Sequence, residues 1–130
     1  ILQFYYLANN NLNVGFKKKN NFFLSSNYKQ IKNYDKKNSN YLFIANWSLS
    51  ETPLQFRKNF EKIIKNSEYI LIGFQENFEN INNLNYFNYL KKKISNKFKI
   101  KIIENKFYKG NFIQPQRHFY FLAKRIKISS

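Results

Sequence analysis

A continuous apolar run at residues 41–45 leads directly into a polar turn at residues 46–53, which reads Asn-Trp-Ser-Leu-Ser-Glu-Thr-Pro. An apolar segment without alternation is typical of a strand that is covered on both faces. Thr52 suits the N-cap of a helix and Pro53 suits its first turn, so we expect a strand, a turn and then a helix. In α/β sheets, ligands bind at such turns, at the carboxyl ends of the strands.

Apolar spacing predicts the helix after this turn and a second buried strand beyond it. The helix is expected to end near Asn66, because its apolar residues recur with a helical period: Phe56, Phe60, Ile63 and Ile64. Residues 69–74 are then apolar throughout and end in Gln75 and Glu76. The pattern therefore predicts a strand, a helix and another strand, with polar residues at the ends of both strands.

The second half of the chain predicts one more helix and two closing strands. The inward face of the helix is expected to hold Leu84, Phe87, Leu90 and Ile94. Apolar residues alternate with lysines over residues 98–102, as in a half-exposed strand, and residues 118–123 form the last apolar segment. No helical pattern separates these two segments, so we expect them to pair in an antiparallel fashion.

This order of elements predicts the α/β class. We expect residues 1–130 to form a single partial domain, whose mostly parallel sheet has helices on both faces and an antiparallel strand pair at one edge. Before residue 41 the pattern supports a short opening helix near residues 4–12, a short strand at residues 22–24 and a weak helical segment around residues 28–34.

Composition excludes several classes of site. The chain has no Cys and one His, so a thiolate metal site is impossible and a histidine metal centre is not expected. No apolar stretch approaches the roughly 20 residues that a membrane-spanning helix needs. The first residue is Ile, and we expect the chain to be an interior piece of a longer protein.

The net charge of +16 raises the question of nucleic acid binding. The cations are 20 Lys and only 3 Arg, alongside many Asn residues, which is the residue usage expected from an AT-rich genome. Specific phosphate recognition favours the bidentate fork of Arg. We therefore expect nonspecific binding of polyanions at low salt but no specific nucleic acid partner.

Three stretches carry a resemblance to a known family: residues 2–7 (LQFYYL), 43–54 (FIANWSLSETPL) and 69–75 (YILIGFQ). Together with the order of elements, they resemble the C-terminal half of a Rossmann-like S-adenosylmethionine-dependent methyltransferase. More narrowly, they are similar to the sugar O-methyltransferases of bacterial surface-polysaccharide clusters. The resemblance covers residues 1 to about 125 and is most specific in the turn at residues 46–53.

One departure from that family concerns the cofactor. Gly occurs only at positions 15, 73 and 110, so there is no Gly-x-Gly turn, and the acidic residue that would bind the ribose is also absent. If the resemblance holds, the N-terminal half that binds most of the cofactor lies upstream of residue 1. We expect this fragment alone to be inactive.

The resemblance implies that four residues form the rim of the pocket for cofactor and acceptor: Asn46, Trp47, Ser50 and Glu51. Gln75, Glu76 and His118 are further candidates, because they also stand at the ends of strands. Asn46 and Trp47 are expected to contact S-adenosylmethionine, and Ser50, Gln75 and Glu76 to contact the sugar. Glu51 and His118 are the candidates to orient or deprotonate the acceptor hydroxyl.

Each of these residues also has a purely structural interpretation. Trp47 would equally well fill a corner of the core, and Glu51 would favour the positive end of the following helix. Ser50 suits a hydrogen bond within the turn, whereas Gln75 and Glu76 suit a solvated loop.

His118 and Arg57 also have structural interpretations. A single His is usually structural, which is the alternative for His118. Arg57 is expected to form a surface ion pair with Glu61 or to reach Glu51.

Two hypotheses follow from the sequence. The first is a cytoplasmic fragment of an O-methyltransferase that uses S-adenosylmethionine and a sugar or glycan acceptor, without a membrane span. The second is a basic RNA-binding protein, such as an organellar ribosomal component, in which the lysines neutralise the RNA backbone. The turn at residues 46–53 between two buried strands favours the enzyme.

Overall fold

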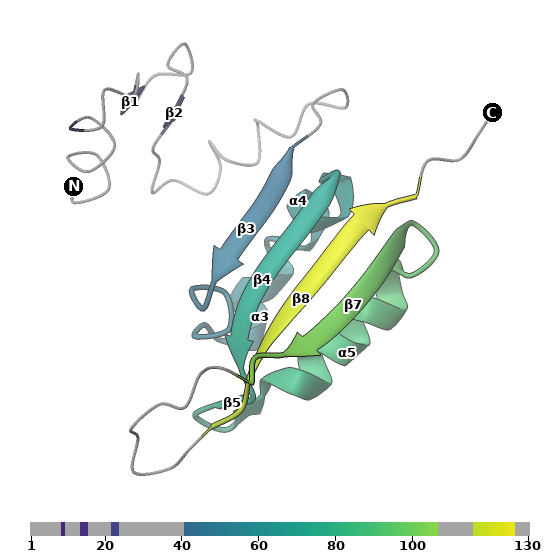
Figure 1. Ribbon diagram of the computed structural model, residues 1–130. Coiled ribbons are helices and arrows are strands. Elements are labelled where there is room, and N and C mark those ends of the chain that lie inside the picture. The colour runs from purple at the N-terminus through teal and green to yellow at the C-terminus, as the bar shows by residue number, and fades with distance from the viewer. Residues whose placement is uncertain (1–8, 10–13, 16–21, 24–40, 107–115, 127–130) are drawn as a thin grey trace. The chain divides into compact units, whose positions relative to one another are not determined.

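The structure is a computed structural model that describes residues 9, 14–15, 22–23, 41–106 and 116–126 (Figure 1). The chain divides into two compact units, residues 1–36 and 37–130. In the first unit, β1 (Val14–Gly15) pairs in parallel with β2 (Phe22–Phe23), which confirms the first two residues of the predicted strand. Apart from residue 9, the predicted opening helix lies outside the described residues, as does the helical segment around residues 28–34.

The second unit contains a four-stranded sheet in the order β3-β4-β8-β7. Its strands are β3 (Leu42–Asn46), β4 (Tyr69–Gln75), β7 (Phe98–Glu104) and β8 (His118–Arg125). A short antiparallel hairpin, β5 (Asn77–Phe78) and β6 (Ile81–Asn82), follows β4. The helices are α3 (Leu54–Lys58), α4 (Glu61–Asn66) and α5 (Asn83–Ile94).

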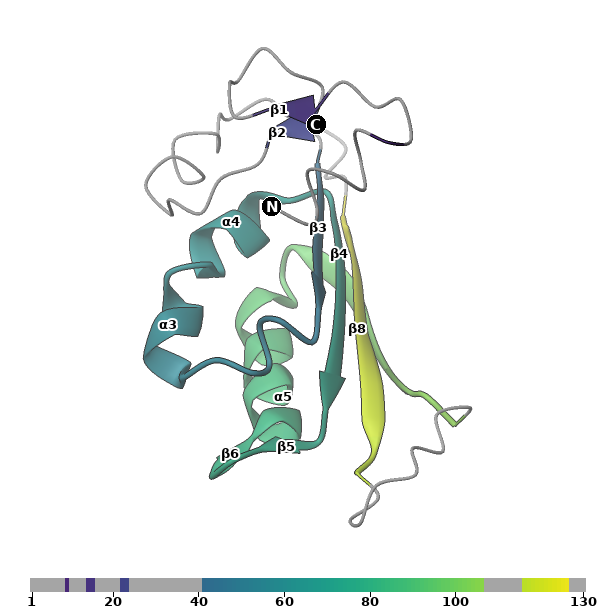
Figure 2. The same cartoon turned by 90° about the vertical axis from the view of Figure 1, so that its left-hand side faces the viewer.

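The predicted fold class is wrong in two respects. The sheet is mixed, because β3 and β4 are parallel whereas β8 is antiparallel to both of its neighbours, β4 and β7. The described helices α3, α4 and α5 all lie on one face of the sheet rather than on both (Figure 2). The antiparallel pair β7–β8 is present as expected, but β8 inserts between β4 and β7 and so changes the character of the whole sheet.

The hydrophobic core lies between the sheet and the helices. Ile72 and Phe74 of β4 are fully buried, as are Phe87 of α5 and Phe121 of β8. The rings of Phe74 and Phe87 lie 4.2 Å apart between centroids, which joins the middle of the sheet to the longest described helix. The inward face predicted for α5 is confirmed, with Leu84 partly rather than fully buried.

The predicted helix after β3 is interrupted near Phe60, which separates α3 from α4. Pro53 is the N-cap of α3, and Thr52 is not, because its hydroxyl donates to the carbonyl of Leu49 at 2.8 Å. The end at Asn66 is as predicted. Of the four apolar residues expected to face inward, Phe56 is 45% exposed.

The sheet face opposite the helices is rich in exposed apolar side chains. By the strand register it carries Leu42, Ile44, Tyr69, Ile103 and Tyr120. The expectation that β3 is covered on both faces is therefore wrong within the described residues, since Ile44 is 59% exposed. An apolar run predicts which residues prefer burial, but it does not supply a second layer to bury them.

Candidate functional site

The carboxyl ends of β3 and β4 lie side by side, as the sequence predicted. The two strands are parallel, with Asn46 opposite Gly73, and the backbone N–H of Trp47 donates to the carbonyl of Gly73 at 2.8 Å. Trp47 has a φ of 61°, a left-handed conformation that a bulky residue rarely adopts and that tends to occur at functional sites. Its ring lies 5.1 Å from that of His118, between centroids. The fold therefore gathers Asn46, Trp47 and His118 at one edge of the sheet.

Gly73 leaves the space that Asn46 and Trp47 occupy. A Cβ atom at position 73 would lie 2.4 Å from Oδ1 of Asn46 and 3.4 Å from Cδ1 of the Trp47 ring. The first distance is too short for non-bonded atoms, so the amide of Asn46 could not stay where it is. The sequence indicated this close contact by a glycine inside an apolar strand. Such a glycine often marks a place where another group comes close to the backbone.

Replacement of Gly73 by Ala should displace the amide of Asn46 while the sheet remains folded, because that amide is the movable end of an exposed side chain. Trp47 is the only Trp of the chain, so its fluorescence reports on this turn alone. We expect a shifted emission maximum, with a loss of about 1–2 kcal/mol in the free energy of unfolding from local overpacking. Ile44→Ala, at an exposed position of the neighbouring strand β3, is the control. Identical emission from G73A and the unchanged protein would contradict this arrangement.

Ser50 and Gln75 tie the turn after β3 to the end of β4. The hydroxyl of Ser50 lies 2.8 Å from the carbonyl oxygen of Trp47 and 3.0 Å from Oε1 of Gln75, and its single proton is shared between these two acceptors. The amide nitrogen of Gln75 donates to Oε1 of Glu51 at 3.5 Å. Ser50 is fully buried and Gln75 nearly so. The interpretation of Ser50 as a hydrogen-bonding turn residue is thus confirmed, whereas Glu51 is exposed at the surface of the turn.

Arg57 is the residue whose role the sequence reasoning missed. Its side chain is fully buried rather than at the surface, and it forms no ion pair among the described residues. Nε donates to the carbonyl of Thr52 at 2.9 Å, and Nη2 donates to the carbonyl of Ser50 at 2.7 Å. Burial lowers the pKa of the guanidinium. The helical spacing of Arg57 to Phe60 and Ile64 was the available signal, since it places Arg57 on the inward side.

The guanidinium of Arg57 also connects the turn to α5. Its Nη1 donates to Oδ1 of Asn83 at 2.7 Å, and the amide nitrogen of Asn83 donates to the carbonyl of Gln75 at 3.0 Å. The ring of Tyr86 lies 4.8 Å from the guanidinium carbon and provides a favourable cation–π contact. One buried cation therefore links the turn after β3, the end of β4 and the start of α5.

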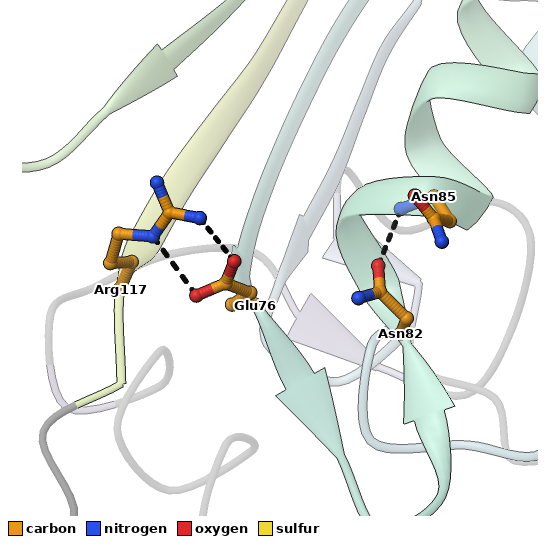
Figure 3. Close-up of polar contacts among 4 residues, drawn as sticks. All are labelled: Glu76, Asn82, Asn85 and Arg117. Carbon is orange, nitrogen blue, oxygen red and sulfur yellow. Dashed lines mark hydrogen bonds and ion pairs between the residues drawn. The ribbon is translucent and has the colours of Figure 1, made fainter.

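Glu76 binds Arg117 (Figure 3). The guanidinium donates to both carboxylate oxygens, with Nε at 2.9 Å from Oε2 and Nη2 bonded to Oε1. These hydrogen bonds lower the pKa of Glu76 and raise that of Arg117. The predicted sugar contact from Glu76 would have to share this carboxylate with Arg117, which is itself exposed.

His118 lies opposite Gln75 at the start of β8 and is nearly buried. Burial lowers the pKa of its imidazole, because the charged form is poorly solvated there. The lowered pKa favours the neutral ring, which is the form that accepts a proton from a hydroxyl. The structure places this potential base beside Trp47 and at the same sheet edge as Asn46.

The described residues show neither a metal-binding cluster nor a membrane-spanning helix. No group of three or more His, Cys, Asp and Glu residues in this part of the chain converges to hold a metal ion. The longest described helix, α5, has 12 residues, and none of the described helices has the length and apolar character to cross a bilayer. No family model, curated protein or solved structure matches this chain.

Proposed function

We propose that this chain is part of an S-adenosylmethionine-dependent O-methyltransferase that modifies a sugar hydroxyl. The observation that carries the proposal is the meeting of Asn46, Trp47 and His118 at the carboxyl ends of two parallel strands. Ligands commonly bind at the carboxyl ends of parallel strands that a helical segment connects, and β3 and β4 are such a pair. The order of β3, β4, α5, β7 and β8 agrees with the order on which the sequence resemblance rests, whereas the division into α3 and α4 and the β5–β6 hairpin were not part of it.

The exposed amide of Asn46 and the ring of Trp47 would form one wall of a cofactor site, and the missing side chain of Gly73 lets both lie against β4. S-adenosylmethionine would supply an electrophilic methyl group on sulfur. Asn46 would orient the cofactor by hydrogen bonding, and Trp47 would exclude water from the reacting centre.

Transfer to an alcohol requires removal of the hydroxyl proton. The neutral imidazole of His118 is suited to accept that proton, while Glu51 would orient the sugar from the surface of the turn. Ser50, Gln75 and Glu76 would then act mainly by holding the turn and its neighbouring strands in place. Arg57 would stabilise the same turn through its hydrogen bonds to the carbonyl groups of Ser50 and Thr52.

Calorimetric titration of the full-length protein with S-adenosylmethionine tests the proposal. We expect binding at micromolar to millimolar cofactor, and we expect Asn46→Ala to weaken it about tenfold, the effect of one lost hydrogen bond. Asn88→Ala, an exposed Asn on α5, is the matched control and should bind normally. Absence of cofactor binding by the unchanged protein would remove the methyltransferase proposal.

A second candidate function rests on the exposed sheet face. There Tyr69 and Tyr120 lie on the same side as Lys124, and the ammonium of Lys124 lies 5.7 Å from the Tyr69 ring centroid. Exposed aromatic rings beside cations can stack unpaired bases and neutralise phosphates. Salt-dependent binding of an RNA oligomer, together with no response to S-adenosylmethionine, would favour this basic RNA-binding function.

A further inference from the structure

A cavity of about 560 Å³ opens between α3, α4, the β5–β6 hairpin and α5. This volume lies within the range of small-molecule sites. None of the residues that line it belongs to the group at the ends of β3 and β4. The cavity is therefore a separate candidate binding site.

One wall of the cavity presents aromatic surface. Tyr86 and Tyr89, one turn apart on α5, both line it, and Tyr89 is 56% exposed. Leu54 and Ile81 add apolar surface nearby. A flat ring left this open to solvent is suited to pack against the C–H face of a pyranose, which is apolar although the rim of the sugar is polar.

Three asparagines, Asn80, Asn82 and Asn85, also line the cavity. An amide both donates and accepts hydrogen bonds, which matches the neighbouring hydroxyls of a sugar ring. Oδ1 of Asn82 accepts from the backbone N–H of Asn85 at 2.8 Å and so caps α5, which orients the amide nitrogen away from the helix (Figure 3). Next to Asn80, Glu79 has a φ of 50°, an uncommon backbone conformation that fixes the hairpin turn.

The charges around the cavity nearly balance. Lys93 donates to Oε2 of Glu61 at 2.7 Å, and the third charged group in the lining is Lys58. Two cations and one anion leave a formal charge of +1, which is little for a site that would hold a nucleotide or a polyphosphate. The lining instead suits a hydroxyl-rich ligand with no charge or a single negative charge.

We propose that this cavity binds a hexopyranose unit of a glycan. The inference goes beyond the methyltransferase proposal, because it concerns a second site with its own residues and needs no cofactor. If both proposals hold, the cavity anchors one sugar unit of a glycan, and another sugar unit of the same glycan is methylated at the sheet edge.

Titration of the ¹⁵N-labelled full-length protein with the methyl glycosides of glucose, galactose and mannose tests this proposal by NMR. We expect at least one sugar to shift the backbone signals of residues 80–93 with a Kd of about 1 mM, a weak affinity suited to a single sugar ring. Tyr89→Ala and Asn85→Ala should each weaken binding at least fivefold. Signals far from the cavity should be unchanged in both variants, which shows that they fold.

Two matched variants control for charge and aromatic content. Lys91→Ala removes an exposed cation from the same helix, and Tyr69→Ala removes an exposed Tyr from the open sheet face. Both should bind the sugar normally. The proposal is overturned if no sugar shifts these signals, if adenosine binds there and the sugars do not, or if Tyr89→Ala binds as well as the unchanged protein. None of these results depends on S-adenosylmethionine, so this site and the methyltransferase site can fail separately.

Discussion

Replacement of Arg57 by Ala is expected to lower the free energy of unfolding by about 3 kcal/mol or more. The buried guanidinium donates to the carbonyl oxygens of Thr52 and Ser50 and to the amide oxygen of Asn83. Each acceptor that loses its donor in a buried place costs about 1–3 kcal/mol. Urea unfolding, followed by the fluorescence of Trp47 and by circular dichroism, measures the loss.

Two further variants separate the charge of Arg57 from its geometry. Arg57→Lys keeps the positive charge but cannot reach three acceptors in fixed directions, so we expect it to lose about 2 kcal/mol. Lys58→Ala changes the exposed neighbour and should stay within about 0.5 kcal/mol of the unchanged protein. If Arg57→Ala were no less stable than Lys58→Ala, the network around Arg57 would have no role in holding the turn.

Phe87→Ala is expected to cost about 3–5 kcal/mol, since it opens a cavity in the centre of the core. Phe87 is fully buried, and its ring contacts Phe74 of β4 at 4.2 Å and lies 6.0 Å from Phe121 of β8, between centroids. A loss of this size is a large part of the 5–15 kcal/mol that stabilises a typical domain. Thermal and urea unfolding of the full chain measure it.

The control for this prediction is another Phe→Ala substitution at an exposed position. Phe56 on α3 is 45% exposed and contacts Phe60, so Phe56→Ala should cost only about 1 kcal/mol. Equal losses for the two variants would mean that Phe87 does not hold α5 against the sheet.

Local periodicity predicted the elements that pack through one regular face. The inward residues of α5 and the alternation in β7 are confirmed. In a helix or strand with a single apolar face, apolar residues recur with the period of that element, so the sequence alone indicates them. The parallel pairing of β3 and β4 is also confirmed. A helical segment joins these two strands, and such a connection returns the chain in the same direction.

Features that depend on distant parts of the chain were not predictable in this way. The sequence indicated that β7 and β8 pair in an antiparallel fashion, but not that β8 would also pair with β4. Arg57 looked like a surface residue, because its buried acceptors include one on α5, 26 residues further along the chain. The N-cap expected at Thr52 was wrong, since the hydroxyl of Thr52 bonds back to Leu49.

The amino-acid sequence by itself determined the approximate positions of β3, β4, α5, β7 and β8, and that Asn46, Trp47 and Gln75 stand at strand ends. The apolar period and the turn residues that specify these features act over a few neighbouring residues. Tertiary structure alone decided that β8 lies beside β4, that His118 meets Trp47, and that the described helices share one face. Which strands become neighbours depends on the packing of side chains that are far apart in the chain, and a local sequence pattern does not predict that packing.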